Sequence, residues 1–320
     1  MDWHQHFQEV FFAQWQRAGL PQPQLYTGAY IDARELHQQP IPFVETDAEQ
    51  TTGIPYYKLK SVYGFGKVTG ELYCELMHCS DETKAAVSDW CGRFNLGISL
   101  VDYICDEMQG GDRILSLDVF KPLLLPGSVL HKAMHPVEHL LSSLVASVFE
   151  NVQEPGSAEI YSAFKKMFEA EQLLASNIRS TTPDLKVIQE AMYLKSAEPF
   201  RVMALYAADN GSVAEPVLSA VQRFGKALGH CYWLIDDARD LWDDVAAGHW
   251  NLFLANDTIL FQHTKEELTT LLQNLELAEK HSVAVIAGLV EALNAFDADE
   301  AVKQRAAGFI GASLWQWYCY

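Results

Sequence analysis

The stretch GHCYWLIDDARDLWDD, residues 229–244, places five acidic residues within nine positions of an otherwise apolar and aromatic segment. Asp236 and Asp240 are four residues apart, so in a helix they share one face, about one turn apart. Like charges on a buried face repel one another and cost free energy, and a cation between them offsets that cost. The stretch therefore predicts a long packed helix that presents carboxylates to a divalent metal.

A second stretch has the same spacing. The sequence FNLGISLVDYICDE, residues 94–107, carries Asp102 and Asp106 among apolar neighbours. One such pair on a helix is commonly solvent-facing or a partner of the helix dipole. Two pairs on two apolar helices are harder to explain in that way. Magnesium favours one or two carboxylates together with phosphate oxygens, so the two pairs predict metal-assisted binding of a phosphorylated substrate.

Helical periodicity dominates the chain, and alternating strand patterns are scarce. We therefore expect one all-α domain over residues 1–320, built from about ten or more packed helices. Pro199 is expected to kink one of these helices, and Ser80 is expected to cap another. The expected helices cover residues 2–18, 56–77, 81–108, 136–151, 157–178, 184–208, 214–245, 264–296 and 299–320.

Composition excludes several classes of protein. The 320 residues carry a net charge of −19, which argues against a nucleic-acid surface, because phosphate backbones are bound by clustered Lys and Arg. The sequence contains no run of about twenty apolar residues, so no membrane span is predicted, and the first residues lack the pattern of a secretory signal. The six cysteines form no CxxC pair, which is typical of reduced thiols. These features predict a cytoplasmic protein.

The sequence EAMYLKSAEPFRVMALYAADNG, residues 190–211, is followed by LSAVQRFGKALGHCYWLIDDARDLWDD, residues 218–244. In order and spacing these segments resemble the isoprenyl diphosphate synthase (polyprenyl synthetase) family of the class I terpenoid synthase superfamily. The resemblance implies an all-α bundle around a central cavity, a homodimer, a prenyl diphosphate substrate and a cluster of three Mg²⁺ ions.

The resemblance also implies roles for individual residues. Lys195 falls on the lysine that contacts the diphosphate, and Tyr103 replaces the middle aspartate of the first Asp-rich motif. The implied metal ligands are Asp102, Asp106, Asp236 and Asp240, which with Lys195 make up the catalytic set. The implied substrate contacts are Lys195, Gln172, Arg113, Asp237 and Lys58. Tyr232, Phe94 and Tyr103 are added as candidate contacts because aromatic faces stabilise a carbocation. For each aromatic residue among them, the alternative is ordinary core packing.

The chain departs from the family pattern at its basic segments. The family's basic GGKRxRP segment has GIPYYKLKS in its place, residues 53–61, which leaves Lys58 and Lys60. One arginine, Arg113, remains after the first motif, and residues 247–249, Ala-Gly-His, replace the lysine that follows the second. A diphosphate bound without metal needs several cationic or N–H donors. Weak binding of isopentenyl diphosphate is therefore expected.

These departures favour cyclisation or rearrangement of one allylic prenyl diphosphate to a terpene, with loss of diphosphate. The alternative is a prenyltransferase that elongates with isopentenyl diphosphate or alkylates another acceptor. Head-to-head condensation is a further variant. A non-catalytic partner subunit of a prenyl diphosphate synthase also remains open. His131, His135 and His139 have a spacing that could suit zinc, but Pro136 interrupts the helix there.

Overall fold

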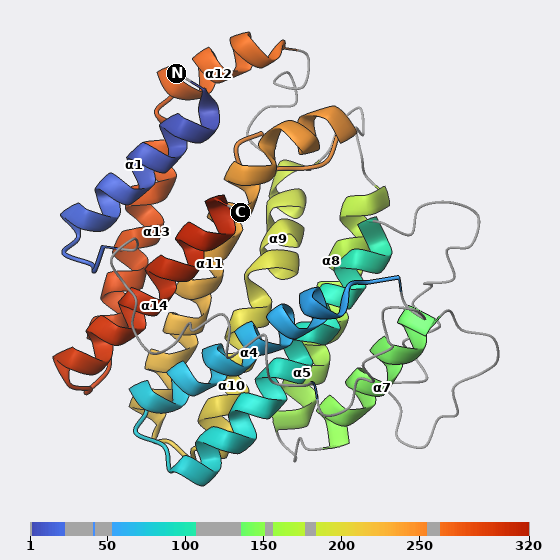
Figure 1. Ribbon diagram of the computed structural model, residues 1–320, viewed down its shortest axis with the longest axis vertical. Helices are drawn as coiled ribbons and strands as arrows, with labels where there is room; N and C mark the ends of the chain where they lie inside the picture. Colours follow the sequence, from blue (N-terminus) through green and yellow to red (C-terminus); the bar gives the residue numbers. More distant parts are fainter. Residues whose placement is uncertain are drawn as a thin grey trace. The chain divides into compact units, whose positions relative to one another are not determined.

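The computed structural model describes residues 2–22, 41, 53–106, 136–150, 156–176, 184–254 and 263–319. These residues form α-helices and no strand, which confirms the predicted all-α class (Figure 1). The helices are α1 (Trp3–Arg17), α4 (Tyr56–Leu76), α5 (Asp81–Asp106), α7 (Pro136–Glu150), α8 (Gly156–Ser176), α9 (Leu185–Ser196), α10 (Glu198–Asn210), α11 (Glu215–Ala247), α12 (Lys265–Asn274), α13 (Leu277–Asn294) and α14 (Glu300–Cys319).

Two predicted helices are each divided in the structure. Residues 184–208 form α9 and α10, which break at Ala197 instead of forming one kinked helix. Pro199 is the second residue of α10, where the missing N–H costs no helical hydrogen bond. Residues 264–296 form α12 and α13, which are separated by Glu276 at a left-handed φ of 54°.

Polar side chains cap the first turns of several helices. The predicted cap at Ser80 is confirmed, because its Oγ accepts a hydrogen bond from the Thr83 backbone N–H at 3.2 Å. Asp184 caps α9 in the same way, with its Oδ1 3.1 Å from the backbone nitrogen of Lys186. Thr264 and Glu267 form a reciprocal capping box at the start of α12. Each cap satisfies backbone donors that have no partner within the helix.

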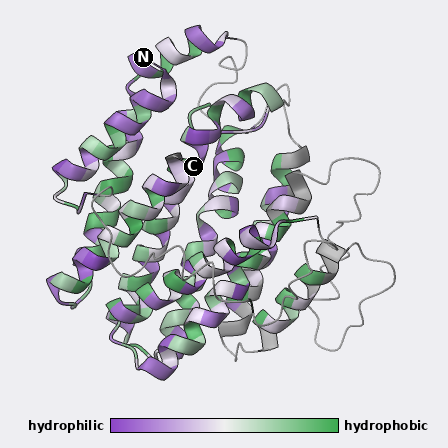
Figure 2. Ribbon diagram, viewed as in Figure 1, coloured by the Kyte–Doolittle hydropathy of each residue, from purple (hydrophilic) through white to green (hydrophobic). Residues whose placement is uncertain are grey.

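The chain divides into two compact units. The first comprises Met1–Gly28, Ala170–Arg201 and Ser219–Tyr320, and the second comprises Ala29–Glu169 and Val202–Leu218. The single domain expected over residues 1–320 stays a prediction. No helix in the described part of the chain is long and apolar enough to cross a membrane. Hydrophobic and hydrophilic residues alternate along the helices, as expected of helices with one packed face (Figure 2).

The core of the first unit is aromatic. Trp3 of α1 is fully buried, and its indole N–H donates to the backbone oxygen of Ala238 in α11 at 3.1 Å. Its ring meets Phe253 edge to face, with centroids 4.9 Å apart. Helix α1 also packs along α13 (Figure 1). Helix α1 therefore contacts both α13 and the acidic helix α11.

The second unit is built on the close packing of α4 against α5. A Cβ at Gly66 would lie 2.4 Å from the backbone oxygen of Cys91, so only glycine permits this approach. On α5, the ring of Trp90 stacks on those of Phe94 and Tyr206, with centroids 5.1 and 3.8 Å apart. These contacts fix the helix that ends at Asp106.

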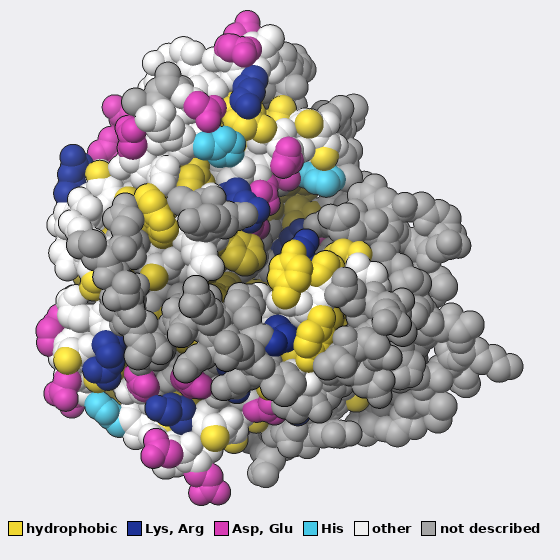
Figure 3. Space-filling model, viewed as in Figure 1, with side chains coloured by type: hydrophobic (Ala, Val, Ile, Leu, Met, Phe, Trp, Pro, Cys, Tyr) yellow, Lys and Arg dark blue, Asp and Glu magenta, His cyan; other side chains and the backbone are white. Residues whose placement is uncertain are grey.

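Charged side chains of both signs lie at the surface. On the face in Figure 3, acidic and basic side chains of the described residues are interspersed.

The described cysteines Cys74, Cys79, Cys91 and Cys231 are free thiols, and three of them are buried. Burial raises the pKa of the Cys91 thiol well above its ordinary value.

Candidate active site

Helix α11 carries the acidic stretch of residues 229–244 and lies against the junction of α9 and α10. A Cβ at Gly229 would lie 2.3 Å from the backbone oxygen of Ala197, which is closer than any side chain allows. This approach brings the end of α9, with Lys195, towards the acidic part of α11. The positive charge of Lys195 accordingly acts on Asp244, where it is the smallest of the influences that oppose the rise in pKa caused by burial.

Two aspartates of α11 turn inward. The Oδ2 atom of Asp237 accepts hydrogen bonds from the Trp233 indole at 3.0 Å and from the Leu252 backbone N–H at 2.5 Å. Burial, followed by the charge of Asp236, raises the pKa of Asp237 well above its ordinary value. Its carboxylate therefore ties the segment after α11 back onto the helix.

Asp244 takes part in the same arrangement. The Asn251 amide donates to Asp244 Oδ2 at 2.8 Å and to the backbone oxygen of Asp237 at 2.7 Å. Burial raises the pKa of Asp244 to about 6, although Asn251 and the nearby His249 oppose that rise. Asn251 is fully buried. It joins the two inward aspartates to the segment that follows the helix.

Asp236 and Asp240 remain partly exposed. The side chain of Asp240 is 45% exposed, and its Oδ1 lies 3.7 Å from Arg239 Nε. Asp236 Oδ1 accepts a hydrogen bond from the Trp317 indole at 3.0 Å. Two carboxylates one turn apart suit Mg²⁺, which takes one or two protein carboxylates and completes its shell with water and phosphate oxygens. Within the described ranges no group of three or more His, Cys, Asp or Glu side chains could enclose a metal.

Lys195 is paired with a carboxylate. Its Nζ lies 3.2 Å from Glu171 Oε1, and their side chains are 31% and 7% exposed. The Lys195 ammonium stands partly open at the end of α9, while the Glu171 carboxylate lies beneath it. Glu171 was not among the predicted site residues, although it directly precedes the predicted substrate contact Gln172.

The predicted aromatic contacts differ in their surroundings. Tyr232 is 8% exposed; its ring stacks on Phe200 at 4.9 Å, and its hydroxyl hydrogen-bonds Ser313 of α14. Phe94 is fully buried in its stack with Trp90. These contacts are those of core packing. Tyr103 lies half-buried near the end of α5, and Lys58 is exposed in the first turn of α4.

Several predicted residues fall outside what the structure describes. Asp102 and Asp106 lie on α5 and Gln172 on α8, but their side chains are outside the described residues. Arg113 lies in a range that is not described, as do His131 and His135, and the side chain of His139 is likewise outside it. That Asp102 and Asp106 belong to one metal site with Asp236 and Asp240 stays a prediction.

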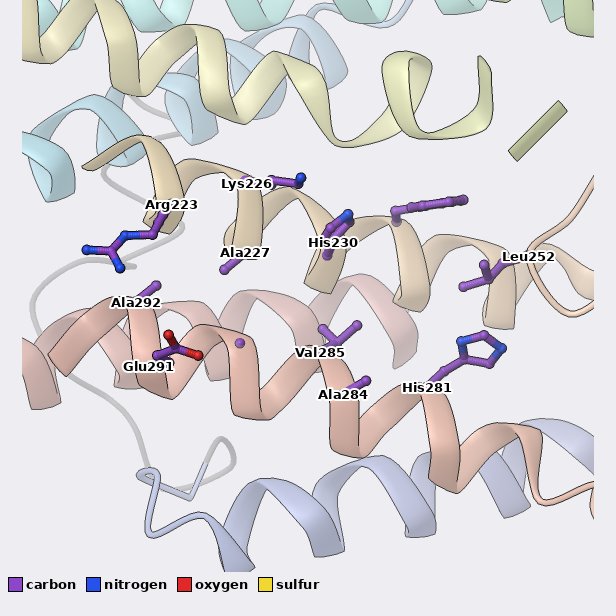
Figure 4. Close-up of a pocket in the computed structure, with 12 residues that line it drawn as sticks. Arg223, Lys226, Ala227, His230, Leu252, His281, Ala284, Val285, Glu291 and Ala292 are labelled. Atoms are coloured by element: carbon purple, nitrogen blue, oxygen red, sulfur yellow. The ribbon is translucent and has the colours of Figure 1, made fainter. Parts of the chain in front are cut away.

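A groove that the sequence did not indicate runs between α11 and α13, with a volume of about 420 Å³. Figure 4 shows Arg223 and Glu291 at one end and Leu252 and His281 at the other. Small residues are among those that line it: Ala227, Ala284, Gly288 and Ala292. Burial lowers the pKa of His281, and burial with the charge of Lys226 lowers that of His230. The groove is lined by none of the predicted site residues.

No protein-family model matches the sequence, and no curated protein matches it. Solved structures do match. A geranylgeranyl pyrophosphate synthase from Lactobacillus brevis has a TM-score of 0.64 at 11% identity, over 88% of this chain and 95% of that chain. A polyprenyl synthase from Caulobacter crescentus, complexed with calcium and isoprenyl diphosphate, has a TM-score of 0.61 at 16% identity, over 97% of each chain.

A linalool/nerolidol synthase from Streptomyces clavuligerus, in complex with 2-fluorogeranyl diphosphate, also matches. Its TM-score is 0.52 at 14% identity, over 90% of this chain and 97% of that chain. At such identities the likeness concerns the path of the chain and the arrangement of its helices. The predicted resemblance is therefore confirmed at the level of the fold.

Proposed function

Because the chain has the all-α fold of isoprenyl diphosphate synthases, we propose that it binds an allylic prenyl diphosphate together with Mg²⁺ and breaks the carbon–oxygen bond to the diphosphate. The prenyl group is then transferred to an acceptor, which is isopentenyl diphosphate if the chain is an elongating synthase. One observation carries the proposal. Of the aspartates on α11, Asp237 and Asp244 accept hydrogen bonds from the segment after the helix, whereas the partly exposed Asp236 and Asp240 lie one turn apart.

The residues of the chain take distinct roles in this proposal. Asp236 and Asp240 would hold the metal on one side, and Asp102 and Asp106 would hold it on the other. When bound, Mg²⁺ supplies positive charge that offsets the charge developing on the leaving diphosphate. Lys195 adds direct positive charge to the same group, with its ammonium oriented by Glu171 at 3.2 Å. Gln172 and Arg113 are proposed as further contacts to the substrate.

A second candidate reaction is cyclisation or rearrangement of a single prenyl diphosphate with loss of diphosphate. It is favoured by the few cations in residues 53–61, where Lys60 lies over the ring of Tyr56 at 5.6 Å. A diphosphate acceptor held without metal needs several such cations. The linalool/nerolidol synthase that shares the fold is consistent with this candidate. Both reactions begin with the same bond cleavage, so they share the aspartates and Lys195.

Product analysis distinguishes the reactions. The purified chain is incubated with Mg²⁺ and geranyl, farnesyl or geranylgeranyl diphosphate, with and without isopentenyl diphosphate. Longer diphosphates that form only with isopentenyl diphosphate support transfer, and volatile products from one substrate support cyclisation. Asp236→Asn should abolish diphosphate release, while Asp243→Asn, an exposed acid on the same helix, should retain it. Absence of release under every condition would reject the proposal and favour the partner-subunit alternative.

A further inference from the structure

The C-terminal helix α14 lies beside α11 in a fixed register. The Tyr232 hydroxyl hydrogen-bonds the Ser313 hydroxyl, and four residues later on both helices Trp317 hydrogen-bonds Asp236. Each pair is separated by 81 residues in sequence. Because the offset is the same, the two helices run in the same direction at this contact. One turn of α14 is therefore matched to the turn of α11 that carries Asp236.

The position of Trp317 is not explained by burial. Its side chain is 47% exposed, which is unusual for a tryptophan on a packed helix. Its ring is nevertheless held in place: the guanidinium of Arg239 lies 6.0 Å from the ring centroid. The next residue, Tyr318, anchors the end of α14, with its hydroxyl donating to the His4 backbone oxygen at 2.9 Å. The indole is thus fixed at the surface, and its N–H points to one carboxylate oxygen of Asp236.

We propose that Trp317 is a positioning residue for Asp236, setting the orientation of the carboxylate that meets the divalent ion. This inference rests on the proposed function. Rotation of a carboxylate about its terminal bond is only weakly restricted, so a hydrogen bond to one oxygen selects its plane. The indole N–H is a donor only: it neither competes for the metal nor neutralises the carboxylate. Loss of such a supporting hydrogen bond typically costs about 10- to 100-fold in metal affinity.

The test measures metal binding directly. Mn²⁺ is titrated into the full-length protein in the presence of inorganic diphosphate, and free Mn²⁺ is followed by electron paramagnetic resonance. Trp317→Phe removes the N–H but keeps an aromatic ring, and it should weaken Mn²⁺ binding about 10- to 100-fold. Trp317→Leu removes the ring as well and should weaken Mn²⁺ binding to the same extent, because both variants lack the N–H. A purely structural role for the ring would instead let Trp317→Phe keep most of the affinity that Trp317→Leu loses.

Trp315 provides the matched control. It lies on the same helix and packs edge to face against Phe12 at 4.7 Å, so Trp315→Phe makes the same chemical change away from Asp236. Its Mn²⁺ affinity should equal that of the unchanged protein. If Trp317→Phe binds Mn²⁺ normally while Asp236→Asn does not, the role of Trp317 is refuted and the proposed function stands. If Asp236→Asn also binds normally, both are refuted.

Discussion

The inward aspartate Asp237 offers a sharp test of how α11 is held. Both of its hydrogen bonds, from the Trp233 indole and the Leu252 backbone N–H, reach the same oxygen, Oδ2. Asp237→Ala removes that acceptor and leaves two donors without it. Asp237→Asn keeps one carbonyl oxygen and can preserve both bonds. The two variants lose the same charge, so the effect of the raised Asp237 pKa on the free energy of unfolding is removed equally from both.

A partly buried donor left without its acceptor costs about 1–3 kcal/mol. With two donors, Asp237→Ala should have a free energy of unfolding about 2–6 kcal/mol below that of Asp237→Asn. Guanidinium unfolding followed by circular dichroism, with divalent metal removed by a chelator, measures the difference. Hydrogen exchange of the Leu252 amide supplies a local readout: it should be protected in Asp237→Asn and unprotected in Asp237→Ala.

Asp243→Asn is the control for this series, because Asp243 is exposed on the same helix and should change stability by less than about 0.5 kcal/mol. Equal stability of the Ala and Asn variants at position 237, with equal protection of the Leu252 amide, would show that the carboxylate does not tie the segment after α11 to the helix.

Three further changes have definite expected outcomes. Gly229→Ala should lower the free energy of unfolding by about 1–3 kcal/mol or more, because its Cβ would overlap the α9–α10 junction. Gly288→Ala, whose Cβ would meet open space, should raise the free energy of unfolding by about 0.5–1 kcal/mol, and equal denaturation midpoints for the two variants would contradict this. The pKa of Asp244 is raised to about 6, so the fold disfavours its ionised form, and the free energy of unfolding should fall by up to about 3 kcal/mol as pH rises from about 4 to 6. Asp244→Asn should remove that fall, and parallel pH–stability curves for the variant and the unchanged protein would refute this prediction. Lys195→Met should lower stability by about 1–3 kcal/mol, because the Glu171 carboxylate loses its ion pair with Lys195. Adding Glu171→Gln should restore stability but not diphosphate release, and recovered release would exclude a substrate role for Lys195.

Much of the helical plan could be predicted from the sequence, because apolar periodicity and local caps are short-range features. Ser80 illustrates this, since its partner Thr83 is three residues away. The break at Ala197 was missed because Pro199 fits both a kinked helix and the first turn of a new one. The break between α12 and α13 at Glu276 was also missed, because a left-handed φ at a non-glycine residue depends on the surrounding packing.

For the candidate site, spacing identified acidic residues but not their separate roles. Asp236, Asp237 and Asp240 look alike in sequence, yet Asp237 is bound to Leu252 and Asp236 to Trp317. These partners are 15 and 81 residues away in the chain, beyond the reach of local pattern. Long-range contacts therefore decide which carboxylates act as ties and which remain partly exposed.

In the proposed site, carboxylates from two helices that are far apart in the sequence share divalent ions around a prenyl diphosphate. A double-mutant cycle on Mn²⁺ affinity in the presence of inorganic diphosphate tests this sharing, with Asp102→Asn, Asp236→Asn and the pair combined. Each single change should weaken binding at least about 10-fold, and the combined loss in free energy should differ from the sum of the two, as expected for side chains in one network. Additive losses, or normal binding by either single variant, would contradict it.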